Sequence, residues 1–315
     1  GLIAPGKAGD TRRSALCNIR AAFMDEAHHC VSEDWRQAVA LLNGIRFFGA
    51  TATPERADGT PLGDAFDDLI VAAKYSELVL SGHLCPCDIA YPEMKRKEQR
   101  RKKVKPDAVA AFLKHAKRED GSYRPGIYFD RTKVECYEAA ERFEAAGIRT
   151  RVITDETPTD ERQAIFDLYT LGWLDMLCSP QALAEGFDSP RAEVCDLQRS
   201  CAHVGGFLQM VGRVLRPYGE KQIADMLELS KRIGKDPHPS ALIKKERALL
   251  IDNSDATSIH GLPTADRKYS LEGCGIELDE PEEKEEQPSD EEAAEREYRR
   301  MVDMKFTLVR DKLRD

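Results

Sequence analysis

The sequence predicts an α/β protein with two parallel-sheet units and a C-terminal tail of different character. Short apolar runs that end abruptly in polar or small residues alternate with segments of helical periodicity, which is typical of buried parallel strands joined by helices. A strongly basic segment at residues 95–105 interrupts this alternation, and the alternation stops beyond residue 253. We therefore expect a first unit at residues 1–94, a basic linker, a second unit at 106–253 and an extension at 254–315.

The first unit has the pattern of one βαβ segment. Apolar strands are predicted at residues 21–24 (AAFM) and 45–48 (IRFF), with a helix at 35–42 between them. The first strand runs into DEAHHC and the second into GATATP. These elements are few for a complete doubly wound domain, so we expect a truncated sheet.

The second unit repeats the alternation more clearly. Its predicted strands lie at residues 126–129, 150–153, 175–178, 193–197 and 249–252, and its predicted helices lie at 133–146 and 158–170. Gly147 ends the first of these helices. The second has Thr157 as its expected N-cap, Pro158 at its first helical position and Asp160 placed for a capping box.

Length and charge are compatible with a nucleic-acid partner. The 315 residues leave room for about two domains, and a hydrophobic share of 41% is enough for packed cores. Residues 277–297 contain 12 acidic and 2 basic residues, a net charge of −10, so the rest of the chain sums to −9 + 10 = +1. The acidic balance therefore belongs to the tail and does not argue against nucleic-acid binding by the body.

The tail and the linker have opposite character. We expect the acidic stretch at 277–292 to be disordered, and the apolar spacing over 291–313 to form a terminal helix that docks on the body or on a protein partner. The linker reads KRKEQRRKKVK, with eight basic residues in eleven. It is either a solvated connection or a phosphate-contacting segment, in which Lys102 and Lys103 would bind nucleic acid.

Membrane and disulfide-rich classes do not fit the sequence. No window approaches the roughly 18 uninterrupted apolar residues of a membrane span, and we see no apolar signal-peptide core. The nine cysteines lack paired spacing, which indicates reduced thiols and a cytoplasmic location. His83, Cys85 and Cys87 offer three zinc ligands, but no second cluster supplies a fourth, so we interpret them as a loop leading into a strand.

Asp25 and Glu26 directly follow the first predicted strand. Adjacent carboxylates at the carboxyl edge of a sheet are costly unless a positive group meets them, and ligands bind at that edge in α/β proteins. One carboxylate can hold Mg²⁺ through water while its neighbour orients an attacking water, as nucleotide hydrolysis requires. The alternative is a helix N-terminus stabilised by acidic residues.

Two further segments carry candidate chemistry. Thr51 and Thr53, in GATATP, offer hydroxyls that can link neighbouring polar groups, although a plain strand-to-loop turn explains them as well. In QMVGRVLRP, Gln209, Arg213 and Arg216 fall within about 40° of one another on a helix, with the last at a fraying end before proline. Two arginines without nearby acidic partners at helical spacing favour an anion such as phosphate, the alternative being a solvated basic face.

These segments occur in an order that resembles superfamily 2 helicases and translocases. DEAH, GATATP, IYFDRT (127–132), LAEGFDSP (183–190) and QMVGRVLRP are similar to motifs II, III, IV, V and VI of that superfamily. The segment ALLIDNSDATSIHGLP (248–263) resembles the end of the DEAD/DEAH-type helicases often found in phages and prophages. The resemblance covers roughly residues 20–270. It implies two RecA-like lobes, with ATP between them and a nucleic-acid strand across both.

The resemblance also implies a role for each matched residue. Asp25 would position Mg²⁺ and Glu26 would activate water, while His28, with Thr51 and Thr53, would couple the nucleotide state to the nucleic-acid site. By the same resemblance, Gly186 and Asp188 would face the nucleotide. Gln209, Arg213 and Arg216 would approach the γ-phosphate, with Arg216 or Arg213 as the arginine finger. Arg131 and Thr132 would lie near the nucleic-acid backbone.

One motif of the family is not matched. A Walker A loop, GxxxxGK[ST], is expected well upstream of DEAH, whereas GLIAPGKA at residues 1–8 has Ala8 in place of the magnesium-binding hydroxyl. Only 18 residues separate Lys7 from Asp25, too few for the intervening elements. We therefore expect an ATP-dependent helicase or translocase core without its N-terminal part, using ATP and Mg²⁺ on DNA or RNA. The alternatives are a non-hydrolysing nucleic-acid-binding module and the motor part of a restriction or recombination system.

Overall fold

The structure, a computed structural model, describes residues 20–30, 45–54, 60–91, 106–180, 188–272 and 277–278. The chain divides into two compact units. The first unit contains Gly1–Lys74, Ala202–Gly205 and Asp266–Asp279. The second unit contains Tyr75–Cys201, Gly206–Ala265 and Glu280–Asp315.

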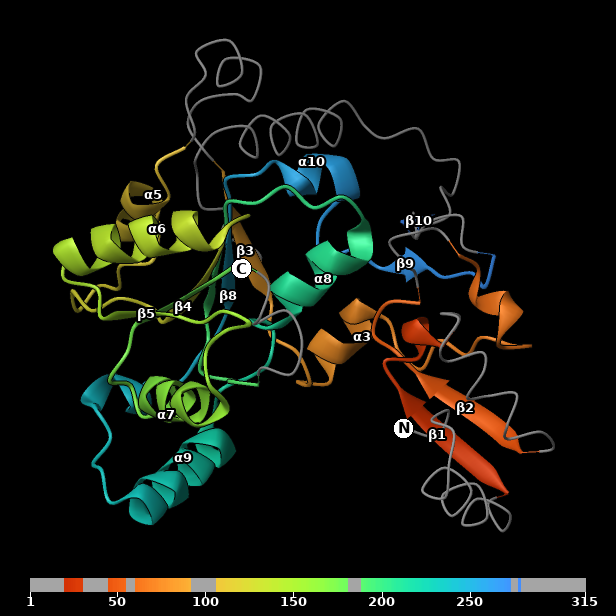
Figure 1. Ribbon diagram of the computed structural model, residues 1–315, viewed down its shortest axis with the longest axis horizontal. Helices are drawn as coiled ribbons and strands as arrows, with labels where there is room; N and C mark the ends of the chain where they lie inside the picture. Colours follow the sequence, from red (N-terminus) through yellow and green to blue (C-terminus); the bar gives the residue numbers. More distant parts are fainter. Residues whose placement is uncertain are drawn as a thin grey trace, which may run out of the picture. The chain divides into compact units, whose positions relative to one another are not determined.

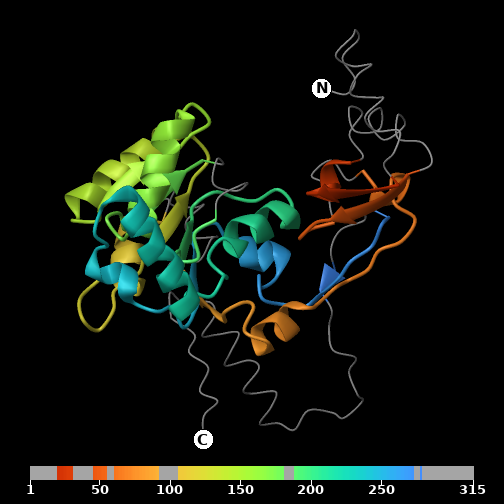
Figure 2. The same ribbon diagram turned by 90° about the horizontal axis from the view of Figure 1, so that it is seen from below.

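Two parallel strands lie side by side in the first unit (Figures 1 and 2). β1 (Ala21–Asp25) pairs with β2 (Arg46–Ala50) in a register that sets Asp25 opposite Ala50. Both strands were predicted from their apolar runs, and both are confirmed. The 3-10 helix η1 (Ala27–His29) follows β1 almost at once. The helix predicted at residues 35–42 lies outside the described residues.

Among the described residues of the first unit, two aromatic side chains of the strands, Phe23 and Phe48, are exposed. Phe23 is 82% exposed and stacks on Phe48, with ring centroids 4.9 Å apart. The expectation of strands buried on both faces is therefore wrong for β1, whose side chains alternate between exposed and half-buried. The unit also contains the 3-10 helix η2 (Leu62–Asp64) and an antiparallel pair of short strands, β9 (Arg267–Lys268) and β10 (Glu277–Leu278).

Within the described ranges of the second unit, six strands form one parallel sheet (Figure 1). Its order is β3-β8-β7-β4-β6-β5, and each neighbouring pair is parallel. The strands are β3 (Cys87–Ala90), β4 (Gly126–Phe129), β5 (Thr150–Val152), β6 (Met176–Ser179), β7 (Val194–Leu197) and β8 (Ala248–Asp252). β4 to β8 confirm the predicted strands to within one residue at each end, whereas β3 has no counterpart among them.

Helices cover both faces of this sheet (Figure 1). Residues of α5 (Ala108–His115) and α6 (Lys133–Ala145) pack on one face, where they form a core with strand residues such as Tyr128 of β4. Residues of α7 (Thr159–Thr170) and α8 (Val204–Gly212) pack on the other face. Neighbouring residues of a strand therefore enter opposite cores, which explains why the strands read as continuous apolar runs.

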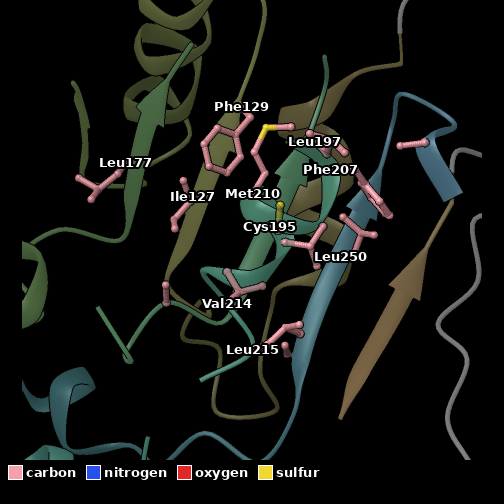
Figure 3. Packing of buried hydrophobic residues seen from close by; sticks show 14 of the residues in the cluster. Ile127, Phe129, Leu177, Cys195, Leu197, Phe207, Met210, Val214, Leu215 and Leu250 are labelled. Carbon is pink, nitrogen blue, oxygen red and sulfur yellow. The ribbon is translucent and has the colours of Figure 1, made fainter. Parts of the chain in front are cut away.

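The second of these cores joins α8 and the turn after it to the middle of the sheet. Figure 3 shows Phe207, Met210 and Val214 gathered with side chains from the strands, among them Ile127 and Leu250. Each of these five residues is at most 4% exposed. Because this packing fixes α8 on the sheet, it also fixes the segment that follows the helix.

Local capping sets where α5 and α6 begin. The Asp107 carboxylate accepts a hydrogen bond from the Ala110 N–H at 3.1 Å, and the Thr132 hydroxyl accepts one from the Glu135 N–H at 3.2 Å. Each interaction satisfies a backbone donor that the first helical turn leaves unpaired. The helix predicted at 133–146 is confirmed as α6, which ends one residue earlier.

The start predicted for α7 is wrong by one residue. Pro158, with φ −55° and ψ 147°, occupies the N-cap, and no side chain caps the helix. The Thr157 hydroxyl, expected to be the cap, instead accepts a hydrogen bond from the Thr154 N–H at 2.9 Å. Asp160 lies in the first turn, where its negative charge interacts favourably with the helix dipole. It does not complete the expected capping box, because no side chain caps this helix.

The division between the units also differs from the predicted boundary at residue 94. β3 pairs with β8 inside the larger sheet, so the division falls after Lys74 rather than after the strand. The further elements of the second unit are α3 (Tyr75–Leu80), α9 (Glu220–Ile233), η3 (Pro239–Leu242) and α10 (Ala256–His260). The linker at 95–105 and the tail beyond residue 278 lie outside the described residues.

Two sequence-wide features have limited structural counterparts. Cysteines within the described ranges carry free thiols: Cys30, Cys85, Cys87, Cys136, Cys178, Cys195 and Cys201. In the same ranges, no helix combines the length and the apolar character that crossing a membrane requires.

We predict that Phe143→Ala lowers the free energy of unfolding by about 3–5 kcal/mol, because the side chain is fully buried and truncation leaves a cavity. The Phe143 ring meets those of Phe112 and Tyr128 edge-on, at centroid distances of 5.5 and 5.7 Å. Val134→Ala, on the exposed face of the same helix, is the control and should change stability by less than about 0.5 kcal/mol. Urea unfolding followed by circular dichroism measures both, and equal losses would contradict the assigned core.

Candidate functional site

The acidic pair lies at the carboxyl end of β1, and its backbone is strained. Asp25 is exposed, and its carboxylate accepts a hydrogen bond from the Glu26 N–H at 3.0 Å. Glu26 has φ 50° and ψ 50°, a left-handed conformation that non-glycine residues adopt at a cost of roughly 1–2 kcal/mol. Such conformations concentrate at functional sites, because something other than local stability retains them.

A hydrogen-bonded chain runs from His28 to the loop after β2, and Glu26 lies in ion-pair contact with His28. The His28 ring is 8% exposed, and its Nδ1 lies 3.0 Å from the Thr51 hydroxyl and 3.4 Å from Glu26 Oε2. The Thr51 hydroxyl donates to the Thr53 carbonyl at 3.1 Å and accepts from the Thr53 N–H at 3.2 Å. With the Thr51 hydroxyl proton directed to that carbonyl, the Nδ1–H tautomer of His28 is the one that can donate to Thr51.

Small residues permit this close approach of the two loops. A Cβ atom on Gly49 would lie 2.6 Å from the Ala27 Cβ and 2.6 Å from the Phe66 ring. Only glycine fits at this position without displacing η1, the short helix that carries His28. The structure thus brings together three of the predicted residues, His28, Thr51 and Thr53, which come from two segments of the chain.

The predicted arginines of the second unit are not on one helix face. α8 ends at Gly212, and the chain continues in tighter turns, in which the Arg213 N–H donates to the Met210 carbonyl at 3.4 Å. Gln209 lies on the helix, whereas Arg213 and Arg216 follow it, and all three are half-buried. The expectation of a shared helical face is wrong, because the packing of Val214 and Leu215 in the core redirects the chain.

Arg216 has an acidic partner that is distant in the sequence. Its guanidinium forms an ion pair with the Asp188 carboxylate, and both side chains are partly exposed, at 37% and 65%. The sequence showed no acidic residue at helical spacing, so this pairing could not be predicted from local pattern. Asp188 lies in the segment that leads into the start of β7. Next to Arg216, the Leu215 carbonyl accepts a hydrogen bond from the Cys85 N–H, just before the start of β3. The ion pair of Arg216 with Asp188 therefore lies at the amino edge of the sheet.

Arg131 and Thr132 lie at the opposite, carboxyl edge, directly after β4. The Arg131 side chain is 61% exposed, with a guanidinium nitrogen 4.0 Å from the Glu135 carboxylate. Thr132 acts as the N-cap of α6 and donates its hydroxyl proton to Glu135 Oε2 at 3.0 Å. Its local role is therefore structural, and Arg131 is the better candidate for contact with a ligand at this edge.

Two buried polar residues at this edge were missed by sequence reasoning. Asp196, within β7, accepts a hydrogen bond from the Asn253 side chain at 2.9 Å, and burial raises the pKa of Asp196 well above its ordinary value. Asp130 accepts a hydrogen bond from the Tyr128 hydroxyl at 2.6 Å. The available signal was a polar residue inside an apolar run, as in VCDL, which places an aspartate at a strand end.

Several candidates cannot be placed, and the zinc alternative gains no support. Gly186, Lys102, Lys103 and residues 1–8 lie outside the described residues. The Cys85 thiol donates to the Leu215 carbonyl at 3.1 Å, whereas the exposed His83 ring bonds the Ser81 hydroxyl. Among the described residues, no three histidine, cysteine or acidic side chains are grouped as metal ligands would be.

Comparisons with known proteins identify the second unit more closely. Residues 105–218 match the family model described as "Helicase conserved C-terminal domain". This range includes β4 to β7, α8 and the segment with both arginines. Together with the relatives below, the match supports a superfamily 2 helicase-like module in this chain.

The chain is similar to parts of longer proteins. It is 25% identical over 72% of its length to the "51.5 kDa protein" of a Lactococcus phage, and 23% identical over 67% to the "Putative ATP-dependent helicase IRC3" of Saccharomyces cerevisiae. These matches cover 52% and 34% of the two relatives, so the chain spans about half of the first and a third of the second.

A solved structure supports the fold. A fragment described as a "putative HsdR subunit of a type I restriction enzyme" from Vibrio vulnificus aligns with a TM-score of 0.54 and 17% identity. The alignment covers 85% of this chain and 49% of that one. The shared feature is the α/β architecture, with the six-stranded parallel sheet as a RecA-like lobe.

We predict that Thr51→Val reduces the fraction of the Nδ1–H tautomer of His28, because the valine methyl cannot accept the ring proton. Long-range ¹⁵N–¹H spectra of protein with ¹⁵N-labelled histidine report the tautomer directly. Thr159→Val, at the exposed first position of α7 in the other unit, is the matched control and should leave the His28 signals unchanged. An unaltered tautomer ratio in Thr51→Val would show that the hydrogen-bonded chain is wrongly assigned.

Proposed function

We propose that the chain forms most of an ATP-dependent nucleic-acid helicase or translocase core, in which ATP hydrolysis drives movement on DNA or RNA. The observation that carries this proposal is the match of residues 105–218 to the helicase C-terminal domain, a range that contains the anchored arginine segment. The order of the five resembling motifs supports the same function. In this proposal Asp25 and Glu26 of the first unit are the acidic residues that act on ATP, and Arg213 and Arg216 of the second unit are the arginines that act on it.

Asp25 and Glu26 are suited to bind Mg²⁺ and to activate water. The exposed Asp25 carboxylate, one oxygen of which bonds the Glu26 N–H, has its other oxygen to hold Mg²⁺ through water. Bound Mg²⁺ would neutralise charge on the phosphates of ATP. The partly exposed Glu26 carboxylate would orient the attacking water and accept its proton. A change in that carboxylate would reach Thr51 and Thr53 through His28, because His28 lies in ion-pair contact with Glu26 and is hydrogen-bonded to Thr51, which in turn bonds Thr53.

Arg216 is suited to bind the γ-phosphate of ATP, because its partner in the structure, the Asp188 carboxylate, is also an anion. A γ-phosphate carries more charge than the Asp188 carboxylate and can accept a bidentate guanidinium. In the proposed cycle Arg216 exchanges Asp188 for the phosphate, and Arg213 and Gln209 support it from the same segment. The partial exposure of this ion pair keeps the cost of the exchange small.

Nucleic acid would bind at the opposite edge of the sheet. Arg131 is exposed after β4, and Lys102 and Lys103 of the basic segment would add phosphate contacts. We also propose that the phosphate-binding loop is supplied by a segment outside these 315 residues, because GLIAPGKA lacks the hydroxyl that such loops place on Mg²⁺.

For the whole protein we predict that Glu26→Gln lowers nucleic-acid-stimulated ATP turnover by roughly 10²–10⁴-fold, and that Arg216→Ala lowers it by about 10³-fold or more. A coupled assay of ADP release measures both. Arg151→Ala is the matched control. Arg151 is an exposed residue of the edge strand β5 and forms an ion pair with Glu144 of α6 at 2.9 Å, so the turnover of this variant should equal the wild type. Wild-type turnover by Arg216→Ala would remove the arginine-finger role.

A second candidate function is nucleic-acid binding without hydrolysis, which the exposed Arg131 and the basic segment favour. Both functions predict that the dissociation constant for an oligonucleotide rises with salt, with a log–log slope that Arg131→Ala reduces by about 1. Arg142→Ala is the control, because Arg142 on α6 forms an ion pair with Asp107, the N-cap of α5, and the slope should be unchanged. Fluorescence anisotropy measures the binding, and a flat salt dependence would contradict both functions. Binding without turnover in the whole protein would favour the second.

A further inference from the structure

Lys245 is a buried lysine whose ammonium group joins two distant segments. Its side chain is 7% exposed, and Nζ donates hydrogen bonds to the carbonyls of Pro190 and Ala192 at 2.8 Å each and of Val214 at 3.1 Å. The first two carbonyls belong to the stretch that follows Asp188. The last lies between Arg213 and Arg216, so one ammonium holds the backbone beside both members of the Asp188–Arg216 ion pair.

The segment after α8 is also held by neighbouring backbone groups. The Lys245 N–H donates to the Tyr218 carbonyl at 2.9 Å, and the Cys85 N–H donates to the Leu215 carbonyl at 2.8 Å. These donors lie just before β8 and β3, so the amino edge of the sheet supplies a row of anchors. Lys245 is the anchor that also reaches the start of β7, through the Ala192 carbonyl.

A charged group is an expensive way to make such a connection. Burial lowers the pKa of Lys245 to about 8, while Cys85, Glu193 and Cys87 favour its charged form and Arg124 disfavours it. Glu193 is already paired with Arg118 at 2.5 Å and Arg124 at 3.0 Å, so it is not a dedicated counter-ion. The ammonium is satisfied instead by three carbonyl oxygens, which would lose this donor if the side chain became apolar.

We propose that Lys245 is a positioning residue that sets the arginine segment after α8 at a fixed place relative to Asp188. The proposal rests on the proposed function, since its consequence is the placement of Arg213 and Arg216 for ATP hydrolysis. It assigns to Lys245 no contact with ATP or nucleic acid. Loss of the ammonium leaves both arginines in the chain but removes the hydrogen bond that holds the Val214 carbonyl between them.

The first test is hydrogen–deuterium exchange of Lys245→Met. We expect peptides covering residues 212–218 to exchange at least about tenfold faster, while peptides covering β4 exchange as in the wild type. Lys244→Met is the matched control, because the neighbouring lysine is exposed and pairs with Glu220 at 2.9 Å on α9. Equal exchange of residues 212–218 in the two variants would overturn the proposal, whether or not the protein hydrolyses ATP.

The second test compares turnover and stability of the whole protein as functions of pH. A neutral amine donates two hydrogen bonds rather than three, so wild-type turnover should fall as the pH rises through about 8, whereas the low turnover of Lys245→Met should show no such step. Stability should move the other way. Since the folded-state pKa lies below the unfolded value of 10.5, the unfolded chain binds more protons between these pH values, and the wild type gains stability relative to Lys245→Met as the pH rises.

These opposite trends separate positioning from a structural role, which would make turnover and stability fall together. If Lys245→Met does not fold, wild-type exchange at pH 7 and pH 9, corrected for the intrinsic rates, replaces it. Residues 212–218 should then lose protection relative to β4 at the higher pH, and unchanged relative protection would overturn the proposal. If the wild type shows no ATP turnover at all, the proposed function fails, while the exchange measurements still test the positioning.

Discussion

The burial of a parallel sheet on both faces is the constraint on which the second unit depends. Strand residues such as Ile127 and Tyr128 enter opposite apolar cores, so polar side chains can reach a ligand only where strands begin or end. The structure follows this constraint closely. Arg131 stands at the carboxyl edge, and the ion pair of Arg216 with Asp188 stands at the amino edge. The two kinds of predicted site residue are therefore separated by the length of the sheet.

Much of this architecture could be predicted from the sequence, because buried strands and helices leave periodic patterns. β4 to β8, α6 and α7 follow from apolar runs and helical spacing. A strand was expected after the Cys-Pro-Cys loop, but its place in the larger sheet was not, because the partner of β3 is β8, about 160 residues further along the chain. The arginine segment was misplaced because Gly212 ends α8 and long-range packing of Val214 redirects the backbone, and neither effect appears in local spacing.

The first unit illustrates the same limits at the level of a site. The sequence indicated that His28, Thr51 and Thr53 belong together only through resemblance, whereas the structure supplies the physical connection through the Thr51 hydroxyl. Gly49 allows the connection by leaving room for Ala27. The left-handed backbone of Glu26 could not be foreseen, since nothing in DEAH requires it. The burial of Lys245 could not be foreseen either, because two adjacent lysines are typical of a solvated surface.

We propose that nucleic acid and the phosphates of ATP bind at opposite edges of the large sheet. Ultraviolet crosslinking of the chain to a single-stranded oligonucleotide, followed by mass spectrometry, locates the edge that nucleic acid contacts. We expect crosslinks in peptides that cover the loop after β4, around Arg131, and none in peptides that cover residues 212–218. Crosslinks confined to residues 212–218 would contradict the proposal.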